Sequence, residues 1–79
     1  MARVLLFGRL GDIAGWRDQV IEADTLTKLL GRLIEADPGL GEALKAPGVQ
    51  VALDQVLVRG DRPLTASSEV AYLPPMSGG

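Results

Sequence analysis

The last residues of the chain carry its most chemically suggestive pattern. The sequence ends in LPPMSGG, residues 73–79. Pro74 and Pro75 fix φ and favour a stiff, extended backbone that leaves a sheet. Gly78 and Gly79 have no Cβ atoms, so they can pass a narrow channel and let a nucleotide approach their backbone. This order predicts a tail that inserts into a partner protein. The residues expected to insert are Pro74, Pro75, Met76, Ser77 and Gly78.

The carboxylate of Gly79 is the reactive group that this pattern offers. An α-carboxyl group ionises near pH about 3.5, so it is anionic at neutral pH. A partner enzyme can use this carboxylate to attack ATP and form an acyl-adenylate, from which a thiol or an amine then displaces AMP. An unhindered glycine suits both steps. A terminal Gly-Gly can also be a frayed end without a function, so an inert tail stays open.

Composition excludes several other kinds of site. The chain has 79 residues, enough for one small domain, and contains neither cysteine nor histidine. It therefore has no thiol nucleophile and no zinc–thiolate site, and it lacks the commonest general base, so we expect no metal site. The net charge of −2 argues against nucleic-acid binding. No apolar run approaches the length of a membrane span, and we expect a cytoplasmic protein.

One helix and five strands are predicted to position the tail. Leucines and isoleucine recur at positions 26, 29, 30, 33 and 34, which is one face of a helix. Asp24 or Thr25 can cap its start, and residues 37–39 end it. Residues 8–15 are predicted to be a loop because glycines recur there, and residues 40–44 a short helical turn. Apolar runs predict strands at 3–7, 16–21, 49–53, 56–58 and 69–73.

These elements predict an α+β fold of the β-grasp, ubiquitin-like type. One apolar helix face needs one sheet face to cover it, and a mixed sheet wrapped over one main helix satisfies this need. The last strand must end at Leu73, because prolines cannot donate to a central ladder. We therefore predict a domain at residues 1–73 and a flexible Gly-Gly tail at 74–79.

The first strand predicts an apolar surface outside the core. Val4 and Leu6 point to one side of it, and Leu5 and Phe7 to the other. A two-layer domain buries only one sheet face, so the other apolar side is either a partner surface or is partly covered by loops. The predicted partner contacts are Phe7, Leu57 and Tyr72, with Arg9 either pairing with acidic groups of a partner or solvated.

The chain resembles the small subunit of molybdopterin synthase, a family of sulfur carriers. Residues 69–79, EVAYLPPMSGG, are similar to the C-terminus of that family, and residues 4–10 are similar to its opening. Residues 51–55 and 61–64 match its third strand and the loop before its last strand. The departures lie outside the tail: Asp54 replaces the usual asparagine, serines 67 and 68 replace glycine-aspartate, and Gly8 replaces a common alanine.

The resemblance implies a role for Gly79 and for several partners. An adenylating enzyme similar to the ubiquitin-activating enzymes would use MgATP to adenylate Gly79, and a sulfur donor would convert it to a thiocarboxylate. The tail would insert into the large subunit of a heterotetrameric synthase and donate sulfur to a cyclic pterin precursor. The chain would then be a non-catalytic subunit that binds no cofactor stably.

Three alternatives remain open from the sequence. The sulfur carrier of thiamine thiazole synthesis shares the β-grasp fold and Gly-Gly end but generally lacks the Pro-Pro step. A ubiquitin-like modifier joined to lysines would use the same acyl-adenylate. A β-grasp interaction module with an inert tail would use none of this chemistry, and it would tolerate removal of Gly79.

Overall fold

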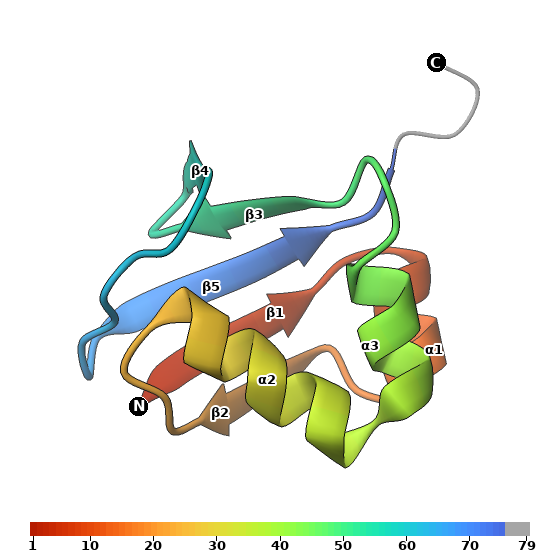
Figure 1. The fold of residues 1–79 in the computed structure, drawn as a ribbon, viewed down its shortest axis with the longest axis horizontal. Helices are drawn as coiled ribbons and strands as arrows, with labels where there is room; N and C mark the ends of the chain where they lie inside the picture. The colour runs from red at the N-terminus through yellow and green to blue at the C-terminus, as the bar shows by residue number, and fades with distance from the viewer. Residues whose placement is uncertain (76–79) are drawn as a thin grey trace.

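The computed structural model describes residues 1–75 as a five-stranded mixed sheet with helices on one face (Figure 1). The strand order is β2-β1-β5-β3-β4; β1 and β5 run parallel, and the other neighbours are antiparallel. This is the β-grasp arrangement that the sequence predicts. The elements in chain order are β1 (Ala2–Leu6), α1 (Arg9–Ala14), β2 (Asp18–Ile21), α2 (Leu26–Ala36), α3 (Pro38–Leu44), β3 (Gln50–Leu53), β4 (Val56–Val58) and β5 (Ser68–Leu73).

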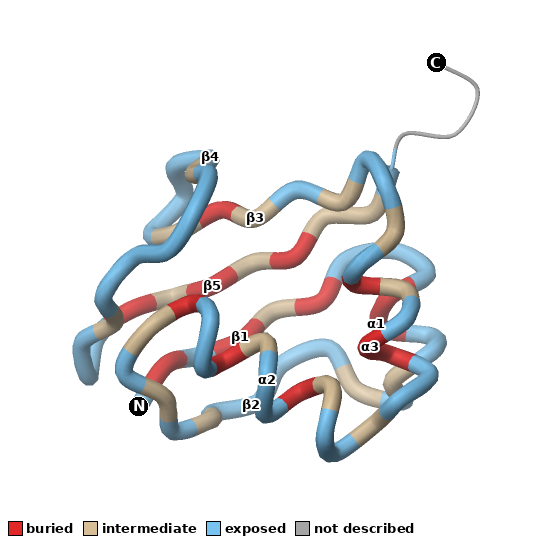
Figure 2. Tube along the Cα trace, in the orientation of Figure 1, coloured by how far each residue is buried: buried red, intermediate tan, exposed pale blue. Residues whose placement is uncertain are grey.

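The core lies between α2 and the central strands (Figure 2). Side chains alternate along β1 and β5, so that Val4 and Val70 are fully buried while their chain neighbours are not. The predicted leucine stripe of α2 covers this face of the sheet, with Leu29 completely buried at its centre. The stripe is therefore part of the core, as its spacing predicts.

Asp37 joins the two helices that cover the sheet. Its backbone N–H donates to the carbonyl of Leu33 at 3.0 Å and so ends α2. Its side-chain Oδ1 accepts from the N–H of Leu40 at 3.1 Å and so begins α3, with Pro38 as the first helical residue. At the start of α2, Thr25 Oγ1 accepts from the N–H of Lys28 at 3.2 Å. The predicted helix and the predicted helical turn are both confirmed, the latter as the longer α3.

The predicted loop at residues 8–15 is wrong in part, because residues 9–14 form α1. Gly8 has φ 55° and ψ −135°, the first central position of a tight turn that the Leu10 N–H closes to the Phe7 carbonyl at 3.2 Å. Gly15 has φ 83° and caps the helix by donating to the carbonyl of Gly11 at 2.9 Å. Gly8 and Gly15, which suggested a loop, thus stand at the two ends of a helix. Leu10 of this helix is buried in the core.

Candidate functional site

The tail begins at the centre of the sheet. β5 lies between β1 and β3, and Pro74 follows its last residue at the end of the sheet where the loop before β3 also lies (Figure 1). The Phe7 N–H donates to the carbonyl of Tyr72 at 3.1 Å, so the chain stays hydrogen-bonded to β1 almost to the prolines. Pro74 is half-buried and Pro75 exposed. The predicted insertion residues at 76–78 and the reactive Gly79 lie outside the described residues.

The face of the sheet opposite the helices carries an apolar row across four strands. Leu5 pairs with Ala71, Ala71 with Ala52, and Ala52 with Leu57. Directly paired residues point to the same side of a sheet, and Leu5 alternates with the buried Val4. The row therefore lies away from the core. We name it, together with Phe7, the open-face patch: Leu5, Phe7, Ala52, Leu57 and Ala71.

Two side chains dominate what this patch offers to a partner. Phe7 is 46% exposed and Leu57 58% exposed. Both were predicted to be at the surface, and both are. Leu5 was predicted to lie on the same side of the first strand as Phe7, whereas Ala52 and Ala71 were not predicted. The pairing register, which a single sequence does not provide, is what joins these residues in one row with Leu57.

Ion pairs lie beside the patch on the same face. Arg3 alternates with Val4 and is therefore directed away from the core; it contacts Asp18 at 2.6 Å and Glu69 at 3.6 Å. The hydrogen bond from Arg3 holds the pKa of the Asp18 carboxyl below its usual range. Arg3 and Asp18 are exposed and Glu69 is partly exposed, so the pairs contribute little stability and their strength falls with salt. They give the apolar patch a charged border on the β1–β2 side.

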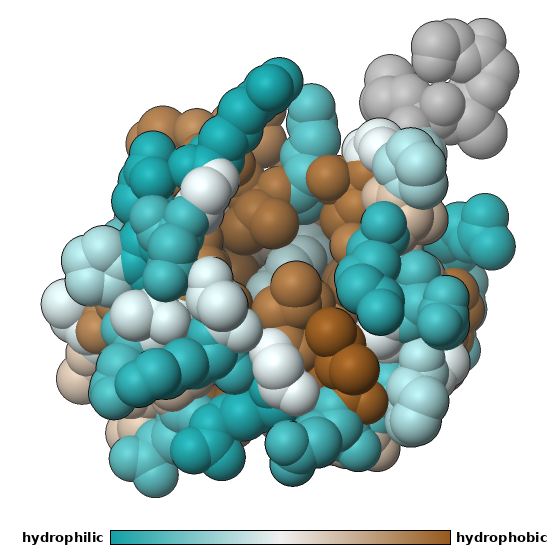
Figure 3. All heavy atoms as spheres, viewed as in Figure 1, coloured by the Kyte–Doolittle hydropathy of each residue, from teal (hydrophilic) through white to brown (hydrophobic). Residues whose placement is uncertain are grey.

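The predicted surface role of Tyr72 is wrong. Tyr72 is only 3% exposed. It pairs with the buried Leu6, and it lies two residues after Val70 in β5, so its side chain points to the core face as that of Val70 does. Burial raises the pKa of its phenol to about 12. It lies at the floor of a hollow of about 160 Å³ between α2 and the strands β3 and β4, where Figure 3 shows hydrophobic side chains gathered. Fixing the strand phase from Val70 would have placed Tyr72 in the core.

A groove connects the tail root with the open-face patch. Its volume is about 500 Å³, and its lining extends along β3 and β4 from Gly48 to Leu57, Arg59 and Gly60. Gly48 also contacts Pro75. A partner that holds the tail can therefore contact this groove and Leu57 at the same time. Arg9, the other predicted partner contact, is exposed at the first position of α1.

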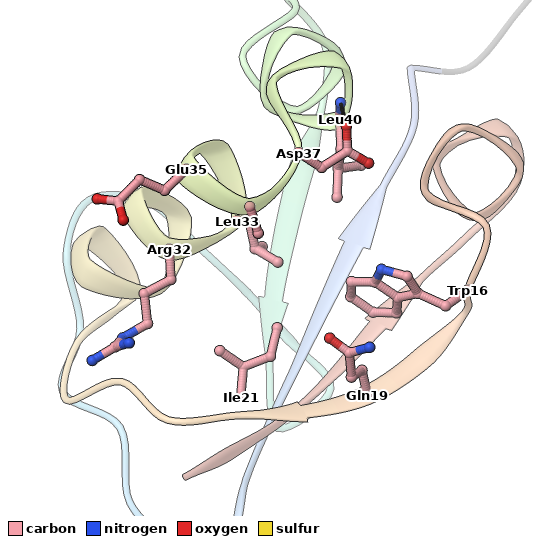
Figure 4. Close-up of a pocket in the computed structure, with 9 residues that line it drawn as sticks. Trp16, Gln19, Ile21, Arg32, Leu33, Glu35, Asp37 and Leu40 are labelled. Carbon is pink, nitrogen blue, oxygen red and sulfur yellow. Dashed lines mark hydrogen bonds between the residues drawn. The ribbon is translucent and has the colours of Figure 1, made fainter.

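A second cleft lies on the helix side, away from the open-face patch. It has a volume of about 390 Å³ between α2 and β2, with Trp16, Ile21 and Leu33 pointing into it (Figure 4). Charged side chains of Arg32, Glu35 and Asp37 surround its mouth. No sequence motif marks these residues, so the cleft was not predicted.

Two absences hold for residues 1–75. No group of three or more acidic side chains in this range is arranged to hold a metal ion. The helices of the same range are all too short or too polar to cross a membrane.

Comparison with known proteins places this arrangement in a family. The ThiS family matches the sequence over residues 4–79, which includes the sheet, the helices and the tail. The chain belongs to the ThiS family.

Members and structural neighbours of known name extend the ThiS-family assignment. The molybdopterin synthase sulfur carrier subunit of Escherichia coli is 32% identical over 81 aligned residues, covering 100% of both chains. The crystal structure of small archaeal modifier protein 1 from Haloferax volcanii has a TM-score of 0.79 and 25% identity, over 99% of this chain and 98% of that one.

A second solved structure adds a complex. Subunits 1 and 2 of the molybdopterin-converting factor of Helicobacter pylori form a protein–protein complex, and the matching chain has a TM-score of 0.73 and 25% identity, with coverage of 99% of this chain and 97% of that one. The resemblance to the molybdopterin synthase small subunit is confirmed by these matches, and so is the ubiquitin-like β-grasp fold. This ThiS-family chain thus combines a β-grasp domain with an apolar sheet face on which Phe7 and Leu57 are exposed, and a tail root beside it.

Proposed function

We propose that the protein is the sulfur carrier of molybdenum cofactor biosynthesis. The observation that carries the proposal is the 32% identity to the Escherichia coli molybdopterin synthase sulfur carrier subunit, which extends over the whole of both chains and so includes the tail. The placement of Pro74 at the end of the central strand supports it, because a reactive tail needs a rigid origin.

The reactive group in this proposal is the carboxylate of Gly79. An adenylating enzyme brings MgATP to it, the carboxylate oxygen attacks the α-phosphorus, and pyrophosphate leaves. Hydrosulfide (HS⁻) released by a donor then attacks the carbonyl carbon of the acyl-adenylate, AMP leaves and the proton is lost, so that a thiocarboxylate remains on Gly79. ATP is consumed by the partner, and the carrier binds no cofactor of its own.

Partner proteins supply the acid–base chemistry. The chain has no histidine and no cysteine, so it holds the sulfur while a partner moves the protons. We propose that residues 74–78 insert into the large subunit of molybdopterin synthase and that the thiocarboxylate there donates sulfur to a cyclic pterin precursor. The working synthase in this proposal is a heterotetramer.

The open-face patch is the proposed docking surface for these partners. Phe7 and Leu57 are large apolar side chains exposed to water, and burial of such side chains is favourable on binding. The groove from Gly48 to Leu57 joins this surface to the tail root. The complex of the Helicobacter pylori subunits supports a partner subunit for this fold. Arg9 remains a proposed contact for acidic groups of a partner.

A second candidate function is that of a protein modifier joined to lysines. The structural similarity to small archaeal modifier protein 1 of Haloferax volcanii favours it. Both functions begin with the same acyl-adenylate of Gly79, and they differ in what displaces AMP: a sulfur nucleophile in the first and a lysine amine in the second.

A single-turnover transfer experiment tests the proposed function. The chain is prepared with a thiocarboxylate at Gly79 and mixed with the large synthase subunit and the cyclic pterin precursor. We expect loss of two thiocarboxylates, one from each of two carrier chains, for every pterin dithiolene that forms. A chain with one residue added after Gly79 is the matched control and should transfer nothing. Sulfur transfer to a thiazole precursor or conjugation to lysines, with no pterin product, would contradict the proposal.

A further inference from the structure

The two prolines at the tail root each lie against a glycine. A Cβ atom built on Gly8 would lie 3.0 Å from Pro74 Cγ and 3.8 Å from Pro74 Cδ. A Cβ atom built on Gly48 would lie 3.0 Å from Pro75 Cβ and 3.4 Å from Pro75 Cγ. Carbon atoms in favourable contact are about 3.5–4.0 Å apart, so a methyl group at either position would displace the proline.

The two glycines approach the prolines from the two strands that neighbour β5. Gly8 lies in the turn after β1, and Gly48 in the loop before β3. Both have a positive φ, 55° and 89°, so the chain turns sharply at each and brings its backbone to the proline rings. Pro74 and Pro75 are thus each bordered by backbone without a side chain. We call these four residues the proline cradle.

We propose that Gly8 and Gly48 are positioning residues, which hold Pro74 and Pro75 so that the tail leaves the sheet in the direction its reaction requires. The inference rests on the proposed function, since it concerns the delivery of Gly79 to an enzyme. Neither glycine touches the reacting atoms. They act through the prolines. Because φ of each proline is fixed, the placement of its ring in the cradle sets the direction in which the tail starts.

Chain geometry sets the expected effect. A methyl group at Gly48 requires Pro75 to move by a few tenths of an ångström to restore ordinary contact distances. Four further residues extend at most about 13 Å, so a tilt at the root shifts the reach of the tail by about 1 Å. Misplacement of a reacting group by 1 Å can cost up to about 100-fold in rate. The substitution acts on the root of the tail and not on the reacting group itself, so we expect a smaller loss of about 5- to 10-fold.

Gly48→Ala is the test, and Gly15→Ala is its matched control. Gly15 also has a positive φ, 83°, but no atom lies within 4 Å of a Cβ built there. Both substitutions place a side chain at a positive φ, and only Gly48→Ala disturbs a proline. The measurements are the rate of ATP-dependent activation of Gly79 by a cognate adenylating enzyme and the urea unfolding curve of each variant.

The expected result separates positioning from stability. Both variants should be destabilised to a similar degree, whereas kcat for activation should fall about 5- to 10-fold only in Gly48→Ala. Gly48 also lines the groove that a partner contacts, so kcat at saturating carrier, and not KM, decides the test. An equal kcat in Gly48→Ala and Gly15→Ala would overturn the inference.

A second pair of variants tests the contact on the other side. Gly8→Ala places its methyl group against Pro74 Cγ, and Pro74→Ala removes that atom. The double variant should therefore lose less activity than the product of the two single losses. Strictly multiplicative losses would show that Gly8 does not act through Pro74 and would contradict the inference.

Nuclear magnetic resonance distinguishes failure of the inference from failure of the proposed function. The Cα–Hα dipolar couplings of Pro74 and Pro75 report their orientation relative to the sheet. We expect the same couplings in the wild type and Gly15→Ala, and different ones in Gly48→Ala. If the wild type is not activated by any adenylating enzyme, the proposed function fails and these couplings alone decide whether the cradle orients the prolines. Unchanged couplings in Gly48→Ala would refute the positioning role of Gly48.

Discussion

Replacement of Leu57 by alanine should weaken partner binding without weakening the fold. Leu57 lies in β4, one of the two edge strands, and is 58% exposed in the free chain. Complete burial of a leucine side chain is worth about 1.5–3 kcal/mol relative to exposure. A partner that covers the exposed part therefore gains about 1–1.7 kcal/mol from it. Removing most of the side chain should raise Kd by about 5- to 20-fold.

Val56→Ala is the control for this prediction. Val56 is adjacent in the chain and 63% exposed, but it pairs with Leu53 and so points to the other side of the sheet. Its truncation removes a similar exposed apolar side chain outside the open-face patch. Both variants should change the free energy of unfolding by less than about 1 kcal/mol, as exposed positions generally do.

The assay is titration calorimetry of each variant with the large synthase subunit and, separately, with the adenylating enzyme. We expect Leu57→Ala to weaken at least one of these complexes and Val56→Ala to weaken neither. Equal affinities for the two variants and the wild type would refute the assignment of the open-face patch as the docking surface.

Two further predictions concern the fold. Asp37→Ala removes the side-chain acceptor of the Leu40 N–H and should lower the free energy of unfolding by about 1 kcal/mol in urea titration, whereas Asp37→Asn should retain most of it. Tyr72, the only tyrosine, should ionise near pH 12 in an ultraviolet titration, because burial raises its pKa to about 12. The fold favours the neutral phenol over the phenolate. This preference contributes about 3 kcal/mol to the free energy of unfolding below pH about 10, and the contribution is lost as pH rises towards 12. A phenol that ionises near pH 10 in the folded chain would contradict this burial.

The sequence predicted the fold well where a hydrophobic pattern dictates it. The stripe from Leu26 to Ile34 can be buried in only one way, and α2 has that orientation. The β-grasp fold followed from this helix, the five apolar runs and the resemblance of the tail. The helix α1 was missed because its glycines are both loop formers and helix boundaries, and only the dihedral angles of Gly8 and Gly15 decide between these roles.

The candidate site could be predicted only in part, because it depends on strand phase and register. Phe7 and Leu57 were placed correctly at the surface, where their roles remain predictions. Tyr72 was wrongly predicted to lie at the surface, because no buried residue was used to decide which side chains of the last strand point to the core. The contacts of Gly8 and Gly48 with the prolines join residues far apart in sequence, and no local sequence pattern predicts them.

Intact-mass spectrometry shows whether Gly79 carries sulfur. The wild-type chain and a variant lacking Gly79 are incubated with a cognate adenylating enzyme, MgATP and a sulfur donor. We expect the mass change of one oxygen-to-sulfur exchange in the wild type, dependent on ATP, and no change in the variant. An unchanged wild-type mass, with an enzyme proven active on another carrier, would rule out a sulfur-carrying role for Gly79.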